Sequence, residues 1–299
     1  MSSLIDLIGN TPLVELNRIN PNPNVKLYGK MEGHNPGGSV KDRAALGMIK
    51  GAIERGDIKP GTKLIEATSG NTGIALAMIA SLYDLEIELV MPENATRERV
   101  QTMEAFGARV ILTPRDRSME GAIDYVAEQV AKGGYFVLNQ FGNPDNWQAH
   151  YATTGPELWR DTDGKITHFV SAMGTTGTVM GVSRYLKERN PAVKIVGCQP
   201  TDESNIPGIR KWPEAYLPKI FERQRVDEVT EVSQKEATAM TRRLAREEAV
   251  FCGMSAGGAA AAAVRVAEQL DSGVVVCVIC DRGDRYLSSD LFDIPQKRK

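Results

Sequence analysis

The chain has 299 residues, of which 42% are hydrophobic and 25% charged, and its 36 lysines and arginines nearly balance its 38 aspartates and glutamates. The resulting net charge of -2 disfavours a nucleic-acid or anionic-membrane partner. The apolar run Val274–Cys280 is far shorter than the roughly 18 residues that span a bilayer, and Met1–Asn10 lacks the pattern of a signal peptide. We therefore expect a soluble cytoplasmic protein, of about two domains at roughly 150 residues each.

The cysteines and histidines do not form a recognisable metal or redox motif. Four cysteines without an export signal are not typical of a disulfide framework. Cys277 and Cys280 have C-x-x-C spacing, but they lie in a run that is typical of a buried strand, where residues three apart point to opposite faces. The three histidines are scattered, so we expect no metal site.

Short β-like runs alternate with helical stretches along most of the chain, beginning with a helix after Ser39. The expected strands are Lys63–Ala67, Glu86–Met91, Arg109–Thr113, Tyr135–Gln140, Ile166–Met173, Val193–Gln199 and Val274–Cys280. The expected helices that follow are Ile74–Leu82, Arg97–Phe106, Glu120–Lys132, Val179–Arg189, Lys235–Glu247 and Gly257–Leu270. Strands separated by helices predict βαβ units, so we expect an α/β fold with doubly wound parallel sheets.

Two segments interrupt this alternation. Asn143–Trp147 carries Asn-Pro-Asp-Asn and is the best site for a linker, which would divide the chain into domains 1–145 and 146–299. Pro200–Phe221 contains four prolines, with charged residues and Trp212 between them. A loop of this length in a compact domain is often a functional lid.

Lys41 is the first residue with distinctive chemistry. Ser39 can cap a helix that begins near it, with Asp42 three residues later, which puts Lys41 in the first helical turn. A cation is electrostatically misplaced there, because the helix N-terminus is already positive. Two interpretations stay open, a solvated surface lysine or an amine of lowered pKa that forms a Schiff base.

Two glycine-rich loops each follow an expected strand and precede an expected helix. Thr68–Gly73 and Ser171–Thr178 combine hydroxyls with free backbone N–H groups, a combination that binds carboxylate or phosphate. The second loop has neither the Walker A ending nor the G-x-G-x-x-G spacing. Either loop alone is also an ordinary strand-to-helix connection.

Taken in order, Asn35–Arg43, Thr68–Gly73 and Gly174–Thr178 resemble the motifs of the fold-type II pyridoxal-phosphate enzymes, and most of all those of the cysteine synthases (O-acetylserine sulfhydrylases). The resemblance extends from Ile8 to Leu287. It implies two α/β domains with the cofactor in the cleft between them, with residues of about 13–34 able to pack on the second domain.

Two further segments are similar to the B branch of that family, which is associated with thiosulfate. These are Ile206–Pro213, which contains Arg210, and Cys280–Asp284. Gly37 departs from the pattern, since the B branch often has alanine there, and it should loosen the turn before Lys41 without changing the chemistry.

The resemblance also implies roles for individual residues. Lys41 would hold pyridoxal 5'-phosphate as an internal aldimine and act as general base, and Asn71 would bind the ring oxygen. The phosphate would be bound by Gly174, Thr175, Thr176, Gly177 and Thr178. The substrate carboxylate would be bound by Thr68, Ser69, Thr72 and Gln140. A neutral residue would face the pyridine nitrogen, for which Ser255 and Cys280 are both candidates.

The implied activity is that of a transferase, a β-replacement that belongs to cysteine biosynthesis. O-Acetyl-L-serine and sulfide would give L-cysteine and acetate through an α-aminoacrylate, and thiosulfate would give S-sulfocysteine. Arg210 would orient thiosulfate, a dianion whose oxygens suit a guanidinium fork. The family implies a homodimer. The alternatives are another fold-type II lyase, such as a serine/threonine dehydratase or a cystathionine β-synthase-like enzyme, and a non-catalytic binding protein.

Overall fold

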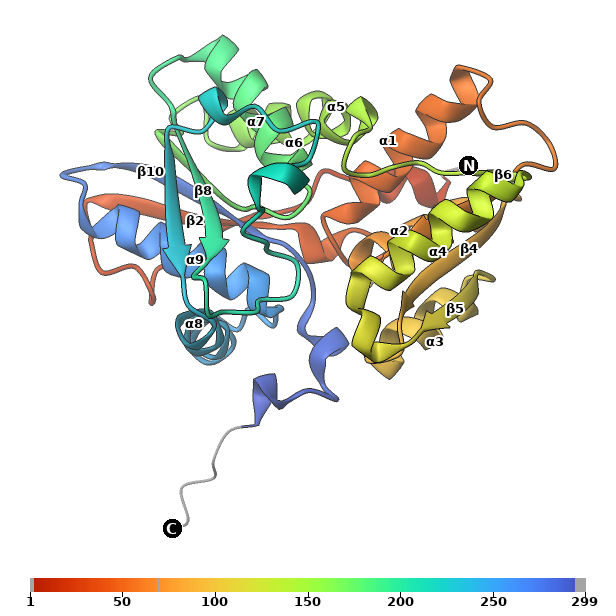
Figure 1. The fold of residues 1–299 in the computed structure, drawn as a ribbon. Helices are drawn as coiled ribbons and strands as arrows, with labels where there is room; N and C mark the ends of the chain where they lie inside the picture. The colour runs from red at the N-terminus through yellow and green to blue at the C-terminus, as the bar shows by residue number, and fades with distance from the viewer. Residues whose placement is uncertain (1–2, 69, 294–299) are drawn as a thin grey trace.

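The computed structural model describes residues 3–68 and 70–293, and Figure 1 shows their strands gathered in two sheets with helices around each. No helix in these residues is long and apolar enough to cross a membrane.

The smaller sheet is entirely parallel, in the order β5-β4-β3-β6. Its strands are β3 (Lys63–Ala67), β4 (Glu86–Pro92), β5 (Arg109–Thr113) and β6 (Tyr135–Phe136). Helices cover both of its faces. On β3, Leu64 packs with α1 (Lys41–Glu54), α2 (Asn71–Leu82) and α3 (Arg97–Ala105), whereas Ile65 packs with α4 (Ser118–Lys132) on the other side, because side chains alternate along a strand.

The larger sheet has the order β1-β2-β10-β7-β8-β9, and only the edge pair β1–β2 is antiparallel. Its strands are β1 (Leu13–Glu15), β2 (Val25–Met31), β7 (His168–Ala172), β8 (Lys194–Pro200), β9 (Glu228–Val232) and β10 (Gly273–Ile279). The N-terminal strand β2 pairs along the whole length of β10. The first part of the chain therefore belongs to the sheet that is otherwise built from residues beyond 167.

This sheet is also covered on both faces, which confirms the doubly wound α/β fold. Phe169 packs with α6 (Thr154–Asp161) and α7 (Gly177–Arg189), whereas the next residue packs with α8 (Gln234–Glu247) and α9 (Met254–Glu268). Cys277 and Cys280 likewise pack in different apolar clusters, and all four cysteines, each within the described residues, are free thiols. Figure 1 shows α8 and α9 side by side on one face of this sheet.

The expected linker at Asn143–Trp147 is wrong, because this segment begins α5 (Pro144–Ala152). The Asn143 side chain accepts a hydrogen bond from the Asp145 backbone N–H at 2.9 Å, and Pro144 occupies the first turn. Asn-Pro can end an element, but here it provides a helix cap followed by a proline that suits a helix start. Helix α5 packs against both α1 and α7.

Other boundaries differ by a few residues. Strand β6 ends at Phe136 and not at Gln140, because the chain turns at Asn139, which has a φ of 56°. Helices α2 and α9 each begin three residues before the expected start. The proline-rich segment after β8 is irregular as expected, apart from one 3-10 turn. The 3-10 helices are η1 (Leu4–Leu7), η2 (Glu32–His34), η3 (Arg115–Arg117), η4 (Glu214–Tyr216), η5 (Arg223–Arg225), η6 (Gly283–Tyr286) and η7 (Asp290–Phe292).

Candidate active site

Lys41 lies where the two sheets meet. It is the first residue of α1, which covers the smaller sheet, while the residues just before it are attached to the end of β10 in the larger sheet. The backbone N–H of Val40 donates to the Cys280 carbonyl at 2.8 Å, and Ser39 forms a β-bridge with Asp281. Ser39 accepts a hydrogen bond from the Lys41 N–H at 3.2 Å.

The cap position of this helix is Val40, one residue after the expected Ser39, and Asp42 does not bond back to the helix start. The carboxylate of Asp42 bonds outside the helix and accepts the Gly37 N–H at 2.5 Å. A Cβ at Gly37 would stand 2.6 Å from Asp42 Oδ1, so the glycine leaves room for this carboxylate. Gly37 therefore lies in a turn before Lys41 that has little space for a larger side chain.

The Lys41 amine has a lowered pKa. Desolvation by burial is the largest cause, and the neighbouring Cys280, Asp281 and Glu32 only partly oppose it. A lowered pKa increases the fraction of neutral amine near pH 7, and the neutral amine is the nucleophilic form. This environment favours the reactive interpretation of Lys41 over that of a solvated surface lysine.

The loop between β7 and α7 places the Thr176 hydroxyl at a helix N-terminus. Thr176 has a φ of 71° at the cap position of α7, and its buried hydroxyl has no hydrogen-bond partner among the described residues. The first N–H groups of an α-helix have no partner within the helix, and together with the dipole they attract anions. A buried hydroxyl left without a partner is costly, which indicates a ligand at this position.

Helix α5 supports this loop with two side chains that are four residues apart. Asn146 Nδ2 donates to Thr175 Oγ1 at 3.1 Å, and His150 Nε2 lies 3.3 Å from Thr178 Oγ1. Burial lowers the pKa of His150 to about 3, so the imidazole is neutral at physiological pH. The hydroxyls of Thr175 and Thr178 are therefore oriented by neutral partners.

The glycines of this loop are required by packing as well as by any ligand. A Cβ at Gly177 would collide with Asn146 Oδ1, and a Cβ at Gly174 would stand 2.7 Å from the Gly208 carbonyl. Protein atoms thus already fill the space that a larger side chain would need.

The other glycine-rich loop, at the start of α2, faces the turn after β6. Thr72 Oγ1 donates to the Gln140 side-chain carbonyl at 2.9 Å. The Glu66 carboxylate accepts the N–H groups of Asn139 at 3.1 Å and Gln140 at 3.4 Å. Burial raises the pKa of Glu66 to about 7, against these backbone hydrogen bonds. Thr68, the first residue of this loop, is buried, and Ser69 lies outside the described residues.

Asn71 is held at both ends of its amide. Its Nδ2 donates to the Asp281 carboxylate at 2.7 Å, and its Oδ1 accepts from Arg285 at 2.6 Å. Asp281 also accepts the Tyr286 hydroxyl at 2.6 Å, and Arg285 donates to the Gly37 carbonyl. One Nδ2 hydrogen of Asn71 remains beyond the bond to Asp281.

Ser255 and Cys280 lie beside each other. Burial raises the pKa of the Cys280 thiol to about 12, the charge of Asp281 adds to the rise, and a hydrogen bond with Ser255 opposes it. Both groups are therefore neutral near pH 7, and the geometry leaves both as candidates for the neutral ring partner.

The Arg210 loop is attached to the loop before α7. The Arg210 backbone N–H donates to the Met173 carbonyl at 2.9 Å. The guanidinium lies 5.3 Å from the Trp212 ring centroid, and the side chain is exposed. The Trp212 ring meets Phe141, the neighbour of Gln140, edge to face with centroids 5.3 Å apart. This loop therefore contacts the Ser171–Thr178 loop and the turn after β6, which faces the other glycine-rich loop.

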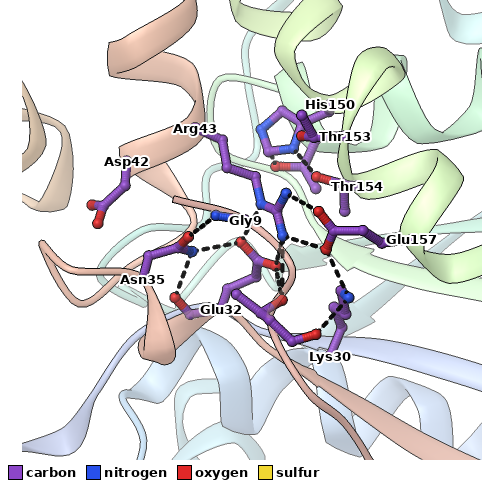
Figure 2. A network of polar contacts seen from close by, with 12 residues as sticks. Gly9, Lys30, Glu32, Asn35, Asp42, Arg43, His150, Thr153, Thr154 and Glu157 are labelled. Carbon is purple, nitrogen blue, oxygen red and sulfur yellow. Dashed lines mark hydrogen bonds and ion pairs between the residues drawn. The ribbon is translucent and has the colours of Figure 1, made fainter. Parts of the chain in front are cut away.

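A buried ionic network fixes the helix that carries Lys41. Figure 2 shows the Arg43 guanidinium between Glu32 and Glu157, while Asp42 points away from the network. Arg43 donates to Glu32 at 2.8 Å and to Glu157 at 2.7 Å, and Lys30 bonds to the other oxygen of Glu157 at 2.8 Å. The network joins β2, α1 and α6, and thus the helices of both sheets.

The reasoning from sequence missed Asn146 and His150 as supports of the site. Their spacing places them on one face of a helix. This spacing would have indicated both residues if the segment had been predicted as a helix. Across residues 3–68 and 70–293, no cluster of three metal-ligating side chains occurs.

Comparison with known proteins identifies the family. Residues 4–281 match the family model described as pyridoxal-phosphate dependent enzyme. The chain is 57% identical over 291 residues to cysteine synthase B of Pseudomonas aeruginosa, covering 97% of each protein. It is 56% identical to cysteine synthase B of Escherichia coli, covering 98% of this chain and 96% of the relative. A crystal structure of cysteine synthase from Entamoeba histolytica superposes with a TM-score of 0.94 at 37% identity, covering 100% of this chain and 93% of the other.

Proposed function

The chain belongs to the pyridoxal-phosphate dependent enzymes and is a transferase of the cysteine synthase group, and on this premise we propose how its residues hold the cofactor and the substrates. The enzyme depends on pyridoxal phosphate and serves cysteine biosynthesis. The proposed reaction joins O-acetyl-L-serine and sulfide into L-cysteine and acetate. Thiosulfate is the proposed second donor, with S-sulfocysteine as its product.

The side chains fit the cofactor at two points. The buried Thr176 hydroxyl has no partner among the described residues and lies at the start of α7, where a phosphate is favoured. Thr175, Thr178 and the backbone of Gly174 and Gly177 complete the proposed phosphate site. The proposed partners of the ring are Asn71 at its oxygen and Ser255 or Cys280 at its nitrogen.

When bound, pyridoxal phosphate supplies an electron sink that acidifies the α-carbon of the amino-acid substrate. Lys41 carries the proton, because its lowered pKa leaves the Nζ amine free to accept a proton and later return it. Thr68, Ser69, Thr72 and Gln140 bind the substrate carboxylate through hydroxyl, amide and backbone N–H groups. This loop lies at the N-terminus of α2, where the helix dipole favours a carboxylate.

The desolvated amine of Lys41 at the junction of the two sheets is the observation that carries this assignment. The test is a product assay with O-acetyl-L-serine plus sulfide and then plus thiosulfate, read by mass spectrometry. Cysteine and S-sulfocysteine are the expected products. Pyruvate as the main product with either donor would instead identify a dehydratase-type lyase.

We also infer a homodimer in the cytoplasm. Leu112 of β5 is 51% exposed and Ile123 of α4 is 50% exposed, so a second copy of this chain could cover apolar surface at these elements. Sedimentation equilibrium would test the dimer, and cell fractionation the location.

A further inference from the structure

Asn146 connects the two loops that the proposed function assigns to phosphate and to substrate carboxylate. It is 2% exposed, on the face of α5 that contacts α7. Its Nδ2 donates to the Gln140 backbone carbonyl at 2.7 Å and to Thr175 Oγ1 at 3.1 Å. The two amide hydrogens of Asn146 therefore bind Thr175 of the proposed phosphate loop (Gly174–Thr178) and Gln140 of the turn after β6.

The chain of hydrogen bonds continues beyond Asn146 in both directions. On one side, the Gln140 side chain accepts from Thr72, at the start of α2. On the other side, Thr175 Oγ1 also accepts the Gly177 N–H at 3.4 Å, at the start of α7. A continuous series of bonds thus runs from one helix N-terminus to the other, with Asn146 in the middle.

The Asn146 amide cannot easily turn away from these partners. A Cβ at Gly177 would collide with Asn146 Oδ1, so the amide already packs against the backbone of the phosphate loop. Helix α5 has separate attachments that do not involve Asn146, namely the Asn143 cap and a double hydrogen bond between Arg55 and Asp145 at 3.0 and 2.8 Å. Asn146 is therefore not needed to begin or anchor α5.

We propose that Asn146 is a positioning residue that couples the phosphate loop to Gln140 and, through Gln140, to the proposed substrate-carboxylate loop (Thr68–Gly73). It acts through Thr175 and Gln140, and this inference rests on the proposed roles of those two residues. Loss of its amide removes one donor from the Gln140 carbonyl and one from Thr175 Oγ1, and both segments gain freedom that binding must then remove. Both cofactor and substrate affinity depend on it, while the proton carried by Lys41 does not.

The test compares Asn146→Ala with Asn22→Ala. Asn22 is a matched control, because its Nδ2 also donates two hydrogen bonds, to the carbonyls of Ala267 and Leu270, far from the site. Asn146→Ala should raise the dissociation constant for pyridoxal phosphate, titrated into enzyme stripped of cofactor, by roughly 5- to 30-fold. The KM for O-acetyl-L-serine should rise by a similar factor, with kcat changed by no more than about threefold. Asn22→Ala should lower the melting temperature only.

A melting temperature that falls in both variants, with unchanged cofactor affinity and KM in Asn146→Ala, would overturn the proposal. If the alanine variant does not fold, Asn146→Ser can replace it, because serine keeps one donor in a smaller side chain. Asn146→Ser should raise the dissociation constant for pyridoxal phosphate and the KM for O-acetyl-L-serine, each by a smaller factor.

A double-mutant cycle with Thr175→Val separates the inference from the assignment beneath it. Asn146→Ala and Thr175→Val should be non-additive in pyridoxal-phosphate affinity, because they remove the two partners of one bond. Weaker binding in Thr175→Val, with additive effects in the cycle, contradicts the coupling alone. If Thr175→Val binds pyridoxal phosphate as tightly as the parent does, the proposed phosphate site is contradicted. The proposed coupling, which rests on that site, is then contradicted as well.

Discussion

The indole Nε1–H of Trp212 donates to the carbonyl oxygen of Gly174 at 2.7 Å, which joins the loop after β8 to the phosphate loop. The Arg210 side chain therefore extends from a backbone held at Met173, and its guanidinium is supported by the Trp212 ring. An exposed cation in this position can meet an incoming anion without having to move the loop.

Arg210→Ala should lower kcat/KM for thiosulfate by roughly 10- to 100-fold, the effect of losing one charge-assisted anchor. Sulfide is small and needs no such anchor, so the reaction with sulfide should fall much less. Steady-state kinetics with each donor at saturating O-acetyl-L-serine would measure the difference.

The matched control is Lys211→Ala, since Lys211 is already paired with Asp202 at 2.6 Å and Glu231 at 2.7 Å. It should leave both donors nearly unaffected. An equal loss with both donors in Arg210→Ala would show that Arg210 closes the loop and does not select the donor.

Lys41→Ala should abolish turnover with little change in the fold. The variant removes the amine that we propose to bind the cofactor and carry the proton, but it leaves the Val40 and Ser39 backbone contacts at the end of β10 in place. We expect undetectable product and a free energy of unfolding within about 1 kcal/mol of the parent. Lys50→Ala, at an exposed position of the same helix, controls for helix effects. Activity close to normal in Lys41→Ala would contradict its assignment.

Thr176→Ala should have opposite effects with and without cofactor. Without cofactor, the change removes a buried hydroxyl that has no partner among the described residues, so stability should stay equal or rise. With cofactor, it removes the proposed phosphate contact, and the affinity for pyridoxal phosphate should fall by about 1.5–3 kcal/mol. Melting curves with and without cofactor would measure both effects of the substitution on stability.

Thr178→Ala is the comparison, because its hydroxyl already contacts His150. It should destabilise the cofactor-free enzyme as well. If Thr176→Ala changed stability in the same way as Thr178→Ala, both with and without cofactor, the proposal that the Thr176 hydroxyl binds the cofactor would be contradicted.

Glu157→Gln should reduce stability and its dependence on acid pH. Burial alone would raise the pKa of Glu157, but Arg43 and Lys30 outweigh it and hold the pKa at about 2. A carboxyl whose pKa is lowered by folding stabilises fully above its unfolded value of about 4.5, and this contribution is lost as pH falls toward 2.

The free energy of unfolding of Glu157→Gln should therefore be lower than that of the parent by about 3–5 kcal/mol at pH 7, because the buried cations lose a charged partner. Its stability should also vary less between pH 4.5 and 2 than that of the parent. Urea unfolding across this range would measure both effects. Glu128→Gln, at an exposed pair with Lys132, should change stability by less than about 0.5 kcal/mol, and a similar loss there would contradict the argument.

Regular βα units were predictable from local pattern. The bounds of β3 and β5 match the expected ranges, because apolar runs with glycine or proline nearby define a buried strand without further information. Helix α5 was missed because Asn143-Pro144 is locally ambiguous between a chain break and a helix start. The pairing of β2 with β10 was not derivable from pattern, since it joins segments almost 250 residues apart.

The sequence by itself determined the α/β class, the family, and the order of Lys41 and the two glycine-rich loops, because motifs and hydrophobic periods are local properties of the chain. Only the tertiary structure decided what stands beside these residues. The desolvation of Lys41, the two-sided hold on Asn71 by Asp281 and Arg285, and the bridge made by Asn146 all need segments that are distant in sequence. Burial and hydrogen-bond partners depend on which elements pack together, and that choice is made by the whole core.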